Sequence, residues 1–561
     1  MPKRLVLDNF LGGRNTLDAI YNVNKNQTTA GGENCWAENK TISNRRGFTA
    51  VASEISSITC TPRQLLLTHM ASGGAVRLLI LGHYAHASNP IAGLMYTENG
   101  TSFTAVGYTT GTISTAGSST TVTGASTVWS TNVRIGDYLL AGGLWTRITA
   151  VNSDTDITIA TARNYSAGTA YIIVQAVSQT KTIGMTLFND GSATQVAYIN
   201  DGARGAALKY NGTTVTEVDA FPDGNKILVH KNYMFVLRHN NTDIRWSALK
   251  DADTWNASNF QTVTADNNPT RGMAIYGDHI VIFCNRKMFR LIGDTFDPSN
   301  PTYVLEEIGV PSHFLFYWPR TVVIHNGVLK FLAADGWYAY DGGTNIEKIS
   351  QIIQADADNV IQRGAVEEVW NDAAVAIVQK GRMWVSVYDT TESNSTLNTI
   401  FVQDERDAWW KWPIAGGRGF TDFVLWGATL FGAGYVGTND GLFTLDTGRT
   451  DAHSGGTAIS SEYVTTDFLF DEETEFIEAV VYMVKQAAGS LTFRVSIDQA
   501  SYISFTLSMT AGVATDIIQK RVPIGRMGKT IRLDFTHATA AETYSVKRID
   551  LIYEPTEAVR I

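Results

Sequence analysis

A strand pattern that recurs along the middle of the chain constrains its fold more than any other feature. Each copy reads apolar strand, turn, apolar strand and then an aromatic residue beside an Asp/Asn-Gly turn; clear copies span 277–294, 326–343 and 427–448. The copies start roughly 45 to 50 residues apart, which is the period of a β-propeller blade. One such sheet cannot bury both of its faces, so neighbouring sheets must stack into a ring. With the looser copies counted, we predict an all-β chain whose main domain is a β-propeller of about seven blades.

The composition agrees with an all-β chain and excludes several protein classes. Charged residues make up only 17% of the sequence, which holds 49 glycines and 11% aromatic residues, and such a composition favours strands and tight turns. The net charge of −10 argues against sequence-independent nucleic-acid binding, which requires a basic face, but it suits a passage that DNA crosses without adhering. Cys35, Cys60 and Cys284 are too few and too scattered for a disulfide framework, so we expect buried free thiols.

The chain has no stretch that approaches the ~20 apolar residues of a membrane span, and its start lacks the apolar run of a signal peptide. We therefore expect no membrane span, and synthesis and folding in the cytoplasm.

Interruptions of the blade pattern predict five segments. One interrupting module has about five short strands with Ser/Thr/Gly turns, which predicts a small β-barrel inserted in a blade loop. Near the end, LTFRVSID (491–498) alternates apolar and polar residues, as the strands of an antiparallel β-sandwich do. The segments are an irregular leader or arm (1–62), a first blade (63–110), the inserted barrel (111–174), the remaining blades (175–450) and a C-terminal β-sandwich (451–561).

One stretch between two blade copies has helical rather than strand spacing. The apolar residues with this spacing predict a helix that covers a blade rim; they are Ile349, Ile352, Ile353 and Val360. Asp356 and Asp358 in this stretch lack the glycine and downstream glutamate of a calcium loop, so we interpret them as a solvated helix start and expect no metal site.

A basic pair marks the end of the leader. Arg45 and Arg46 stand close to Phe48 and are too few to form a nucleic-acid patch. They suit an anchor that ties the leader to an acidic surface, and we predict that Arg45, Arg46 and Phe48 contact a neighbouring subunit or an adaptor protein.

An aromatic cluster, AWWKWP, contains Trp409, Trp410 and Trp412. Tryptophans at the end of a strand usually fill the gap between wedge-shaped blades, where each buries ~150–250 Å². The alternative is a platform on which a glycan stacks.

The sequence contains no recognisable catalytic motif. A glycosidase needs two carboxylates about 5–10 Å apart, often with arginines that bind a substrate acid, and no Arg triad with a Glu–Tyr pair can be assembled at a defensible spacing. The turns at 97–103, 210–215 and 340–345 faintly match the Asp-box turn of sialidases, but Asn/Asp-Gly elements are hairpin turns. A phosphate loop, a nucleophile elbow, CxxC and HExxH are absent. We therefore expect no catalytic residue, no cofactor and no enzymatic activity.

Four features together resemble the tail nozzle, or head–tail hub, proteins of short-tailed bacteriophages. The leader DNFLGGRNT followed by GGENCWAENKTISNRRGFT, ending in Arg46-Gly47-Phe48, is similar to their opening. The inserted module, with VRIGDYLLAGGLWTRITAVNSDTD, resembles a small barrel of phage tail proteins, and VLKFLAADGWYAYDG resembles their blade motif. The stretch from EYVTTDFLF to RIDLIYEP resembles their C-terminal domain.

This resemblance implies a structural virion protein of the tail. Relatives form six-fold rings below the portal and adaptor, retain packaged DNA and serve as the conduit for its ejection. The implied partners are copies of the chain itself, the adaptor, tail fibres or other tail proteins, and double-stranded DNA in the channel. Two alternatives stay open: a glycan-binding tail protein that recognises the host through the tryptophans, and a propeller glycoside hydrolase.

Overall fold

The structure is a computed structural model in which 58% of the residues are strand and 4% helix. It describes residues 1–561 apart from short internal segments and the last residues. The gaps are 20–21, 30, 47, 53–58, 70–75, 86–90, 101–102, 178–182, 190–194, 202–204, 225, 239–240, 267, 297–301, 362–373, 393–396, 415–418, 435–440, 448–449, 452–456, 511–515, 540–541 and 557–561.

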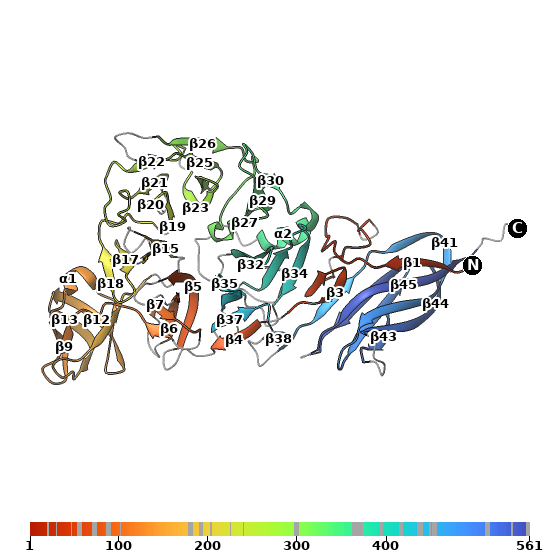
Figure 1. Ribbon diagram of the computed structural model, residues 1–561, viewed down its shortest axis with the longest axis horizontal. Coiled ribbons are helices and arrows are strands. Elements are labelled where there is room, and N and C mark those ends of the chain that lie inside the picture. The colour runs from red at the N-terminus through yellow and green to blue at the C-terminus, as the bar shows by residue number, and fades with distance from the viewer. Residues whose placement is uncertain are drawn as a thin grey trace.

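Seven antiparallel sheets form the blades of a propeller, which confirms the prediction of an all-β propeller fold (Figure 1). The first four blades are β5 (Thr59–His69) to β8 (Thr104–Ala105) with β6 (Val76–Ala85) and β7 (Ile91–Thr97); β15 (Gly184–Phe188), β16 (Val196–Asn200), β17 (Ala207–Tyr210) and β18 (Val215–Val218); β19 (Lys226–His230), β20 (Tyr233–Leu237), β21 (Asp243–Trp246) and β22 (Phe260–Thr262); and β23 (Thr270–Tyr276), β24 (His279–Cys284), β25 (Met288–Ile292) and β26 (Val304–Ile308). The last three are β27 (Val323–His325), β28 (Val328–Ala333), β29 (Gly336–Tyr340) and β30 (Glu347–Lys348); β31 (Val375–Gln379), β32 (Arg382–Val387), β33 (Thr399–Gln403) and β34 (Trp409–Pro413); and β35 (Phe420–Trp426), β36 (Thr429–Gly434), β37 (Gly441–Leu445) and β4 (Phe48–Ala52). We number them blades 1 to 7 in this order.

The ring is closed by a strand from the N-terminal segment. β4 pairs with β37, with Phe443 opposite Ala50 and Leu445 opposite Phe48, so the outer strand of blade 7 comes from the start of the chain. β38 (Thr450–Asp451) and β39 (Thr457–Ala458) extend this sheet. We expected residues 1–62 to form an irregular leader. The structure corrects this expectation, because β4 from this segment is a strand of blade 7 and its other strands pair within the C-terminal sheet.

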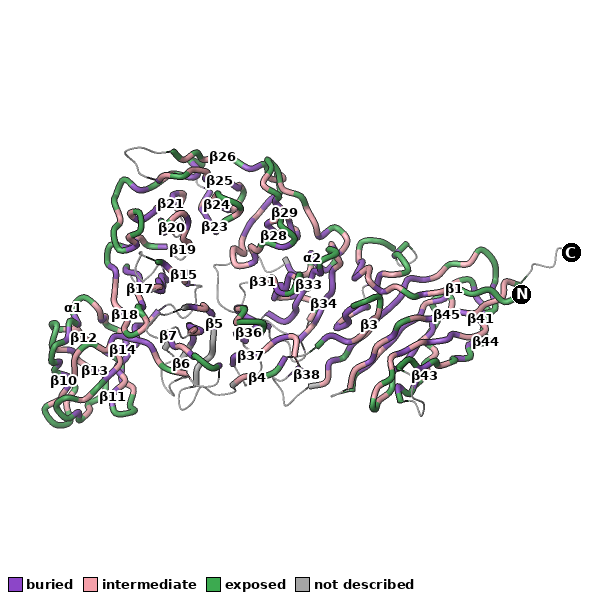
Figure 2. The backbone as a smooth tube through the Cα atoms, viewed as in Figure 1, coloured by how far each residue is buried: buried purple, intermediate pink, exposed green. Residues whose placement is uncertain are grey.

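Hydrophobic cores between neighbouring blades hold the ring together. Phe283 of blade 4 stacks on Phe316 with ring centroids 4.4 Å apart and meets Phe331 of blade 5 at 5.0 Å. All three rings are fully buried. Figure 2 shows that the buried residues are concentrated in the blade strands, as expected where neighbouring sheets bury their apolar faces against one another.

A side-chain hydrogen bond repeats between successive blades. It explains why a polar residue recurs at the end of the innermost strand of a blade. In four blades this residue donates from its side chain to a backbone carbonyl in the hairpin turn of the next blade. The pairs are His230 to Asp278 (3.0 Å), Tyr276 to Gly327 (2.8 Å), His325 to Gly381 (2.9 Å) and Gln379 to Ala428 (3.2 Å). Burial lowers the pKa of His230 and of His325, so both rings are neutral donors at physiological pH. We name these bonds the blade latches.

The latch at His325 is expected to contribute measurably to stability. Its Nε2–H donates to Gly381, while its Nδ1 accepts from the buried ammonium of Lys330 at 3.1 Å. The substitution His325→Leu leaves a buried carbonyl and a buried ammonium each short of a partner. We expect the free energy of unfolding to fall by about 1–3 kcal/mol, measured by urea denaturation. His313→Leu is the control, since His313 is 63% exposed and its loss should cost less than about 0.5 kcal/mol. Equal effects of the two substitutions would contradict the latch.

A six-stranded barrel-like module lies in the connection between blades 1 and 2. Its sheet order is β14-β11-β12-β13-β10-β9, and a short helix closes one end over the fully buried Trp129, whose Nε1–H donates to the hydroxyl of Tyr171 at 3.0 Å. The elements are β9 (Thr112–Ser114), β10 (Ser119–Ala125), α1 (Trp129–Asn132), β11 (Tyr138–Ala141), β12 (Leu144–Ser153), β13 (Asp156–Arg163) and β14 (Tyr171–Val174).

Removing residues 111–174 is expected to leave the propeller folded. Tyr108 and Ile173 exchange two backbone hydrogen bonds of 2.8 and 2.9 Å, so the chain enters and leaves the module side by side. Tyr138 and Val174 pack on blade 1 in a shared core, so the deletion variant should melt at a lower temperature than the full chain. Calorimetry should still show a cooperative transition. Full-length Tyr138→Ser is the control that loosens the same contact, and loss of cooperativity only in the deletion variant would contradict the predicted boundary.

The C-terminal part is an antiparallel sheet of nine strands with one continuous core. Leu491, Phe493 and Val495 alternate into this core as their spacing predicts. Three of the strands come from the first 44 residues, and β1 pairs with β45 from Lys3–Tyr553 to Leu7–Ile549. The strands are β1 (Lys3–Leu7), β2 (Cys35–Glu38), β3 (Thr41–Asn44), β40 (Ser461–Val464), β41 (Phe468–Val484), β42 (Ser490–Ile497), β43 (Ile503–Ser508), β44 (Ile517–His537) and β45 (Ser545–Pro555).

The three parts lie in line, with the inserted module at one end, the propeller in the middle and the C-terminal sheet at the other end (Figure 1). The predicted rim helix is present as η2 (Gln351–Ile353) and α2 (Gln354–Ile361), and Ile353 and Val360 are buried against blade 5. None of the helices in the part of the chain that the structure describes is long and apolar enough to cross a membrane.

Candidate functional site

Arg45, the first residue of the basic pair, forms a buried ion pair within its own chain. Its guanidinium donates two hydrogen bonds to the carboxylate of Asp451, at 2.9 and 2.7 Å, and a third to Asn34 at 2.7 Å. Both side chains of the ion pair have 0% exposure. The guanidinium also lies 4.8 Å from the ring centre of Phe48. Arg45 therefore ties the N-terminal segment to an acidic residue of its own chain, and it cannot contact an adaptor or a second subunit as predicted.

The other two predicted contact residues, Phe48 and Arg46, differ in their exposure to solvent. Phe48 is 3% exposed and packs edge-on against Phe420 at 5.0 Å, so it is a core residue of blade 7 rather than a contact residue. Arg46 is exposed and stays available to a partner.

The three tryptophans of the aromatic cluster are all buried, with exposures of 1, 1 and 2% for Trp409, Trp410 and Trp412. Trp409 packs at 5.0 Å against Trp337, the aromatic residue of the blade motif. Trp412 packs against Trp36 at 5.7 Å and donates its Nε1–H to the carbonyl of Cys35 at 3.0 Å. As placed, these rings have no free face for a sugar, so the platform interpretation is corrected: they fill the joints between blades 5 and 6 and between blade 6 and the N-terminal segment.

The predicted free thiols are buried where the structure describes them. Cys35 and Cys284 are unpaired and buried, whereas the side chain of Cys60 lies outside the described residues.

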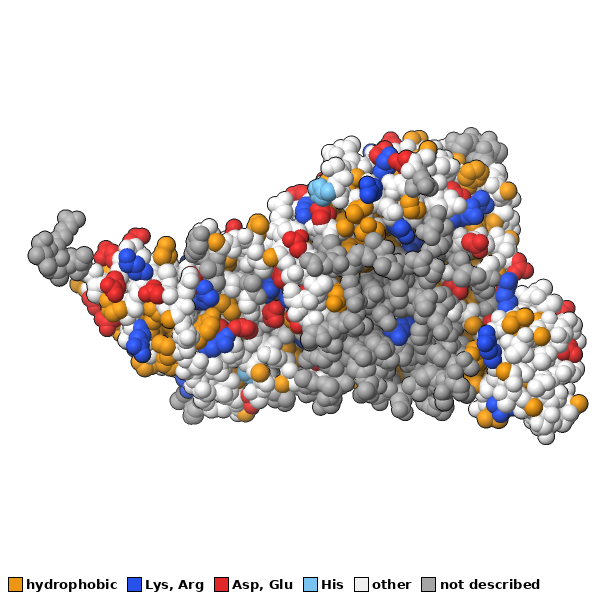
Figure 3. Space-filling view, turned by 180° about the vertical axis from the view of Figure 1, so that it is seen from behind, with side chains coloured by type: hydrophobic (Ala, Val, Ile, Leu, Met, Phe, Trp, Pro, Cys, Tyr) orange, Lys and Arg blue, Asp and Glu red, His pale blue; other side chains and the backbone are white. Residues whose placement is uncertain are grey.

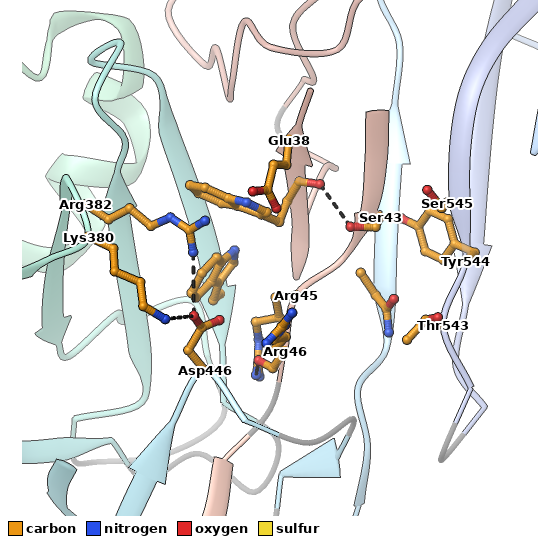
Figure 4. Close-up of a pocket in the computed structure, with 13 residues that line it drawn as sticks. Glu38, Ser43, Arg45, Arg46, Lys380, Arg382, Asp446, Thr543, Tyr544 and Ser545 are labelled. Carbon is orange, nitrogen blue, oxygen red and sulfur yellow. Dashed lines mark hydrogen bonds and ion pairs between the residues drawn. The ribbon is translucent and has the colours of Figure 1, made fainter. Parts of the chain in front are cut away.

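A cleft of about 360 Å³ separates the propeller from the C-terminal sheet (Figure 4). We call it the interdomain cleft. Its charged side chains are Glu38, Arg46, Lys380, Arg382 and Asp446, besides Arg45, whose charge Asp451 balances. Asp446 stands between Lys380 Nζ at 3.7 Å and the Arg382 guanidinium at 3.8 Å. These separations exceed a hydrogen bond, so both cations keep donors for another group.

A second cluster lies beneath the N-terminal segment, around the buried ammonium of Lys411. The Nζ atom of Lys411 lies 3.0 Å from Asp389, 3.2 Å from Glu33 and 3.3 Å from Glu392. We call these four residues the Lys411 cluster. The neighbouring guanidinium of Arg14 contacts Glu33 at 3.9 Å.

Arg14 also corrects the interpretation of the helix start. Its Nε and Nη2 atoms bind the carboxylate of Asp356 at 2.7 and 2.9 Å, and both side chains are buried. Asp358 is exposed as predicted, whereas Asp356 anchors the N-terminal segment to α2.

The charges of the Lys411 cluster act on one another. Burial raises the pKa of Glu33, and the nearby cations Lys411 and Arg14 offset this only in part. Burial alone lowers the pKa of Lys411, but the carboxylates of Glu33 and Asp389 outweigh it, so its pKa lies above the usual value. No sequence motif identifies this cluster, because Glu33 comes from the N-terminal segment whereas Asp389, Glu392 and Lys411 belong to blade 6. The local signal is a lysine inside an apolar, tryptophan-rich strand.

An ion pair crosses the inside of the ring. Arg320, in η1 (Pro319–Thr321) before blade 5, binds Asp422 of blade 7 at 2.7 Å and donates to the carbonyl of Thr421 at 2.8 Å. Because blade 6 lies between blades 5 and 7, this contact joins two parts of the ring that are not adjacent blades. Burial raises the pKa of Asp422, and Arg320 counteracts the effect. Within the described ranges, no group of three or more His, Cys, Asp or Glu residues is arranged to hold a metal ion.

No protein-family profile and no curated protein matches this chain. Among solved structures, an exo-β-1,3-galactanase from Phanerochaete chrysosporium has 10% identity and a TM-score of 0.23, and the match covers 82% of this chain and 99% of that one. AztD from Citrobacter koseri has 10% identity and a TM-score of 0.25, with 63% and 95% covered. A family 43 arabinoxylan arabinofuranohydrolase from Bacillus subtilis has 9% identity and a TM-score of 0.17, with 91% and 99% covered.

These matches correct the expectation that the chain has no enzymatic activity, because two of the three proteins are glycoside hydrolases. At these identities and TM-scores the likeness does not assign a reaction or a substrate. The chemistry has to be judged from the residues of this chain.

Proposed function

We propose that this chain is a structural component of a short-tailed phage tail, in the nozzle below the portal and adaptor, where it retains packaged DNA and forms part of the conduit for its ejection. The observation that carries the proposal is the path of the N-terminal segment, which joins the propeller and the C-terminal sheet into one body. β1 to β3 pair within the C-terminal sheet, and β4 completes blade 7. Between β1 and β2, the backbone amides of Arg14 and Asn34 donate to carbonyls of the outer strand of blade 6 at 2.7 and 3.0 Å.

Such a body is suited to bearing load. The buried pairs Arg45–Asp451 and Arg14–Asp356 hold the segment at two points, so both pairs have to break before the segment can come away from the propeller. The Arg320–Asp422 pair adds a link between the start of blade 5 and blade 7. The net charge of −10 favours passage of DNA over adhesion.

The test is the position of the chain on virions of the phage that encodes it. Gold-labelled antibody should mark the base of a short tail on purified particles, in proportion to the copies present. Label on fibres would favour the host-recognition alternative. Particles without label, while the antibody detects the chain in infected-cell lysate, would refute a structural role in the virion.

The Lys411 cluster favours a second candidate, a glycoside hydrolase. Asp389 and Glu392 both lie within 3.3 Å of one ammonium, so their carboxylates are no more than about 6 Å apart, near the about 5–5.5 Å spacing of retaining enzymes. Glu33, whose pKa burial raises, has the property of a general acid. Release of reducing sugar from a panel of polysaccharides tests this candidate. Glu33→Gln and Glu392→Gln should each abolish the release, whereas Glu347→Gln, an exposed control in β30, should not; release that survives both substitutions would refute this site.

A further inference from the structure

In the C-terminal sheet, β40 lies between the N-terminal segment and β44. On one side of β40, the backbones of Glu33 and Glu462 exchange two hydrogen bonds of 2.9 Å. On the other side, β40 pairs with β44 from Ser461–His537 to Val464–Asp534. β40 also follows β39 of the blade 7 sheet along the chain. It is therefore the strand by which the chain passes from the propeller into the C-terminal sheet, and we call its contact with β44 the β40 joint.

Two carboxylates share one cation at the β40 joint. The Nη2 atom of Arg494, on the neighbouring strand β42, binds both Oε1 of Glu462 and Oδ2 of Asp534. Oxygens bound to one nitrogen at ordinary hydrogen-bond lengths of about 3 Å lie no more than about 6 Å apart. The Asp534 side chain is 0% exposed, and its Oδ1 atom makes no hydrogen bond. Burial and the carboxylate of Glu462 raise the pKa of Asp534 to about 7, and Arg494 offsets this only in part.

Neutral side chains make up part of the surroundings of Asp534. Burial raises the pKa of Tyr502, whose ring centre lies 4.6 Å from the Arg494 guanidinium, and it raises the pKa of Tyr544 well above the ordinary value. Burial lowers the pKa of His537, which lies further along β44. All three side chains are therefore neutral near pH 7 and supply no charge to balance a carboxylate.

The other nearby cation is paired with a different carboxylate. Arg532, on the same strand as Asp534, donates to both oxygens of Asp467 at 2.6 and 2.8 Å. Within the part of the chain that the structure describes, Arg494 is the one cation that forms an ion pair with Asp534.

The bridge to the N-terminal segment adds a further carboxylate. Glu33 stands directly opposite Glu462, and side chains at such positions point to the same face of a sheet. The ammonium of Lys411, which faces Glu33, is shared with the other carboxylates of the Lys411 cluster. Carboxylates therefore outnumber cations at the joint. This excess is local, since Figure 3 shows acidic and basic side chains interspersed over the C-terminal end of the molecule.

We propose that Asp534 and Glu462 share a proton that fastens β40 to β44, and that loss of this proton as the pH rises to neutral loosens the β40 joint. With the proton bound, the pair carries one negative charge against the one positive charge of Arg494. Without it, two carboxylates repel each other beside a single cation. The pairing of β1 to β3 within the same sheet keeps the domains connected, so the joint can open locally. This device is independent of the proposed role in a tail.

The direction of the pH effect follows from linkage. A carboxyl group whose folded-state pKa is raised binds its proton more tightly when the joint is closed. The closed joint is therefore fully stable below the ordinary pKa of 3.8 and loses stability as the pH rises to about 7. Each pH unit in this window raises the equilibrium constant for opening by up to about tenfold, and the effect levels off above the window.

Hydrogen exchange of the full-length chain between pH 5 and pH 9 tests the joint, with each rate expressed as protection relative to the intrinsic exchange rate at the same pH. In the wild type, protection of residues 461–464 should fall by up to about a hundredfold from pH 5 to pH 7 and then level off. In Asp534→Asn, whose amide cannot ionise, the change should be less than about threefold. β20, buried in blade 3, is the internal reference and should not follow this profile.

Two control variants separate the joint from its neighbours. Asp467→Asn removes a similarly buried carboxylate that has its own arginine, and Glu33→Gln removes a carboxyl group of the Lys411 cluster; both should keep most of the wild-type fall. Loss of the fall in Glu33→Gln would place the titrating group in the Lys411 cluster and overturn the proposal.

The decisive comparison is between Asp534→Asn and the wild type. A wild type with level protection from pH 5 to pH 7 overturns the proposal, as does Asp534→Asn protection that falls as steeply as that of the wild type. If Asp534→Asn does not fold, Glu462→Gln is the second variant and should make the fall at least about tenfold smaller, because it removes the neighbouring charge; an unchanged fall would overturn the proposal. The proposed function fails separately, if the chain is missing from virions.

Discussion

Replacing Arg45 by methionine is expected to lower the free energy of unfolding by about 3–5 kcal/mol. The substitution leaves the carboxylate of Asp451 at 0% exposure without its two hydrogen bonds, and it also removes the donor to Asn34. Urea denaturation followed by tryptophan fluorescence measures the effect, because the N-terminal segment packs on Trp412 through Trp36.

Arg46 provides the matched control for this prediction. It is the adjacent residue and has the same charge, but its side chain is exposed, so Arg46→Met should change the free energy of unfolding by less than about 0.5 kcal/mol. The double variant Arg45→Met with Asp451→Leu should recover most of the loss, since an apolar pair leaves no buried charge. If Arg45→Met proves as mild as Arg46→Met, the pair does not hold the N-terminal segment.

Replacing Lys411 by methionine is expected to cost a similar amount, about 3–5 kcal/mol at pH 8. Its ammonium is 5% exposed and is the cation shared by Glu33, Asp389 and Glu392. Without it, three carboxylates face one another in a largely buried space, and the N-terminal segment is expected to detach first. Hydrogen exchange of residues 10–36 checks this, and Lys250→Met, at an exposed turn, is the control.

The same variant should show a distinctive pH dependence. Burial raises the pKa of Glu33, and Lys411 is the largest of the groups that lower it, so the pKa should rise further in Lys411→Met. A carboxyl group with a raised folded-state pKa binds its proton more tightly in the folded state, so the free energy of unfolding falls as pH rises from the usual value near 4.5 through the raised one. The deficit of Lys411→Met relative to the wild type should therefore shrink between pH 8 and pH 5. A deficit that is constant over this range would contradict the cluster.

Much of the fold is readable from the sequence, whereas the candidate sites are not. Strand alternation at Leu491, Phe493 and Val495 and the turns beside the blade motif report local geometry, so each blade is predictable by itself. The carboxylate partners of Arg45 and Arg14 come from segments hundreds of residues away, as does Glu33 beside Lys411, and no spacing rule relates such positions. The aromatic cluster shows the same limit, because the sequence does not distinguish a tryptophan that is buried between blades from one that binds a sugar.

The sequence by itself determined the repeated unit, because period, alternation and turn residues are properties of neighbouring positions and set how a single sheet forms. It also determined that these sheets must stack, since one blade leaves an apolar face uncovered. Only the tertiary structure decided how the ring closes and what the N-terminal segment does. β4 pairs with β37 of blade 7 because the edge of a sheet has unpaired backbone N–H and C=O groups, and the folded chain brings β4 beside them. The burial of Arg45 beside Asp451 follows from that placement, because desolvated charges gain stability only where the folded chain brings their partners within hydrogen-bond distance.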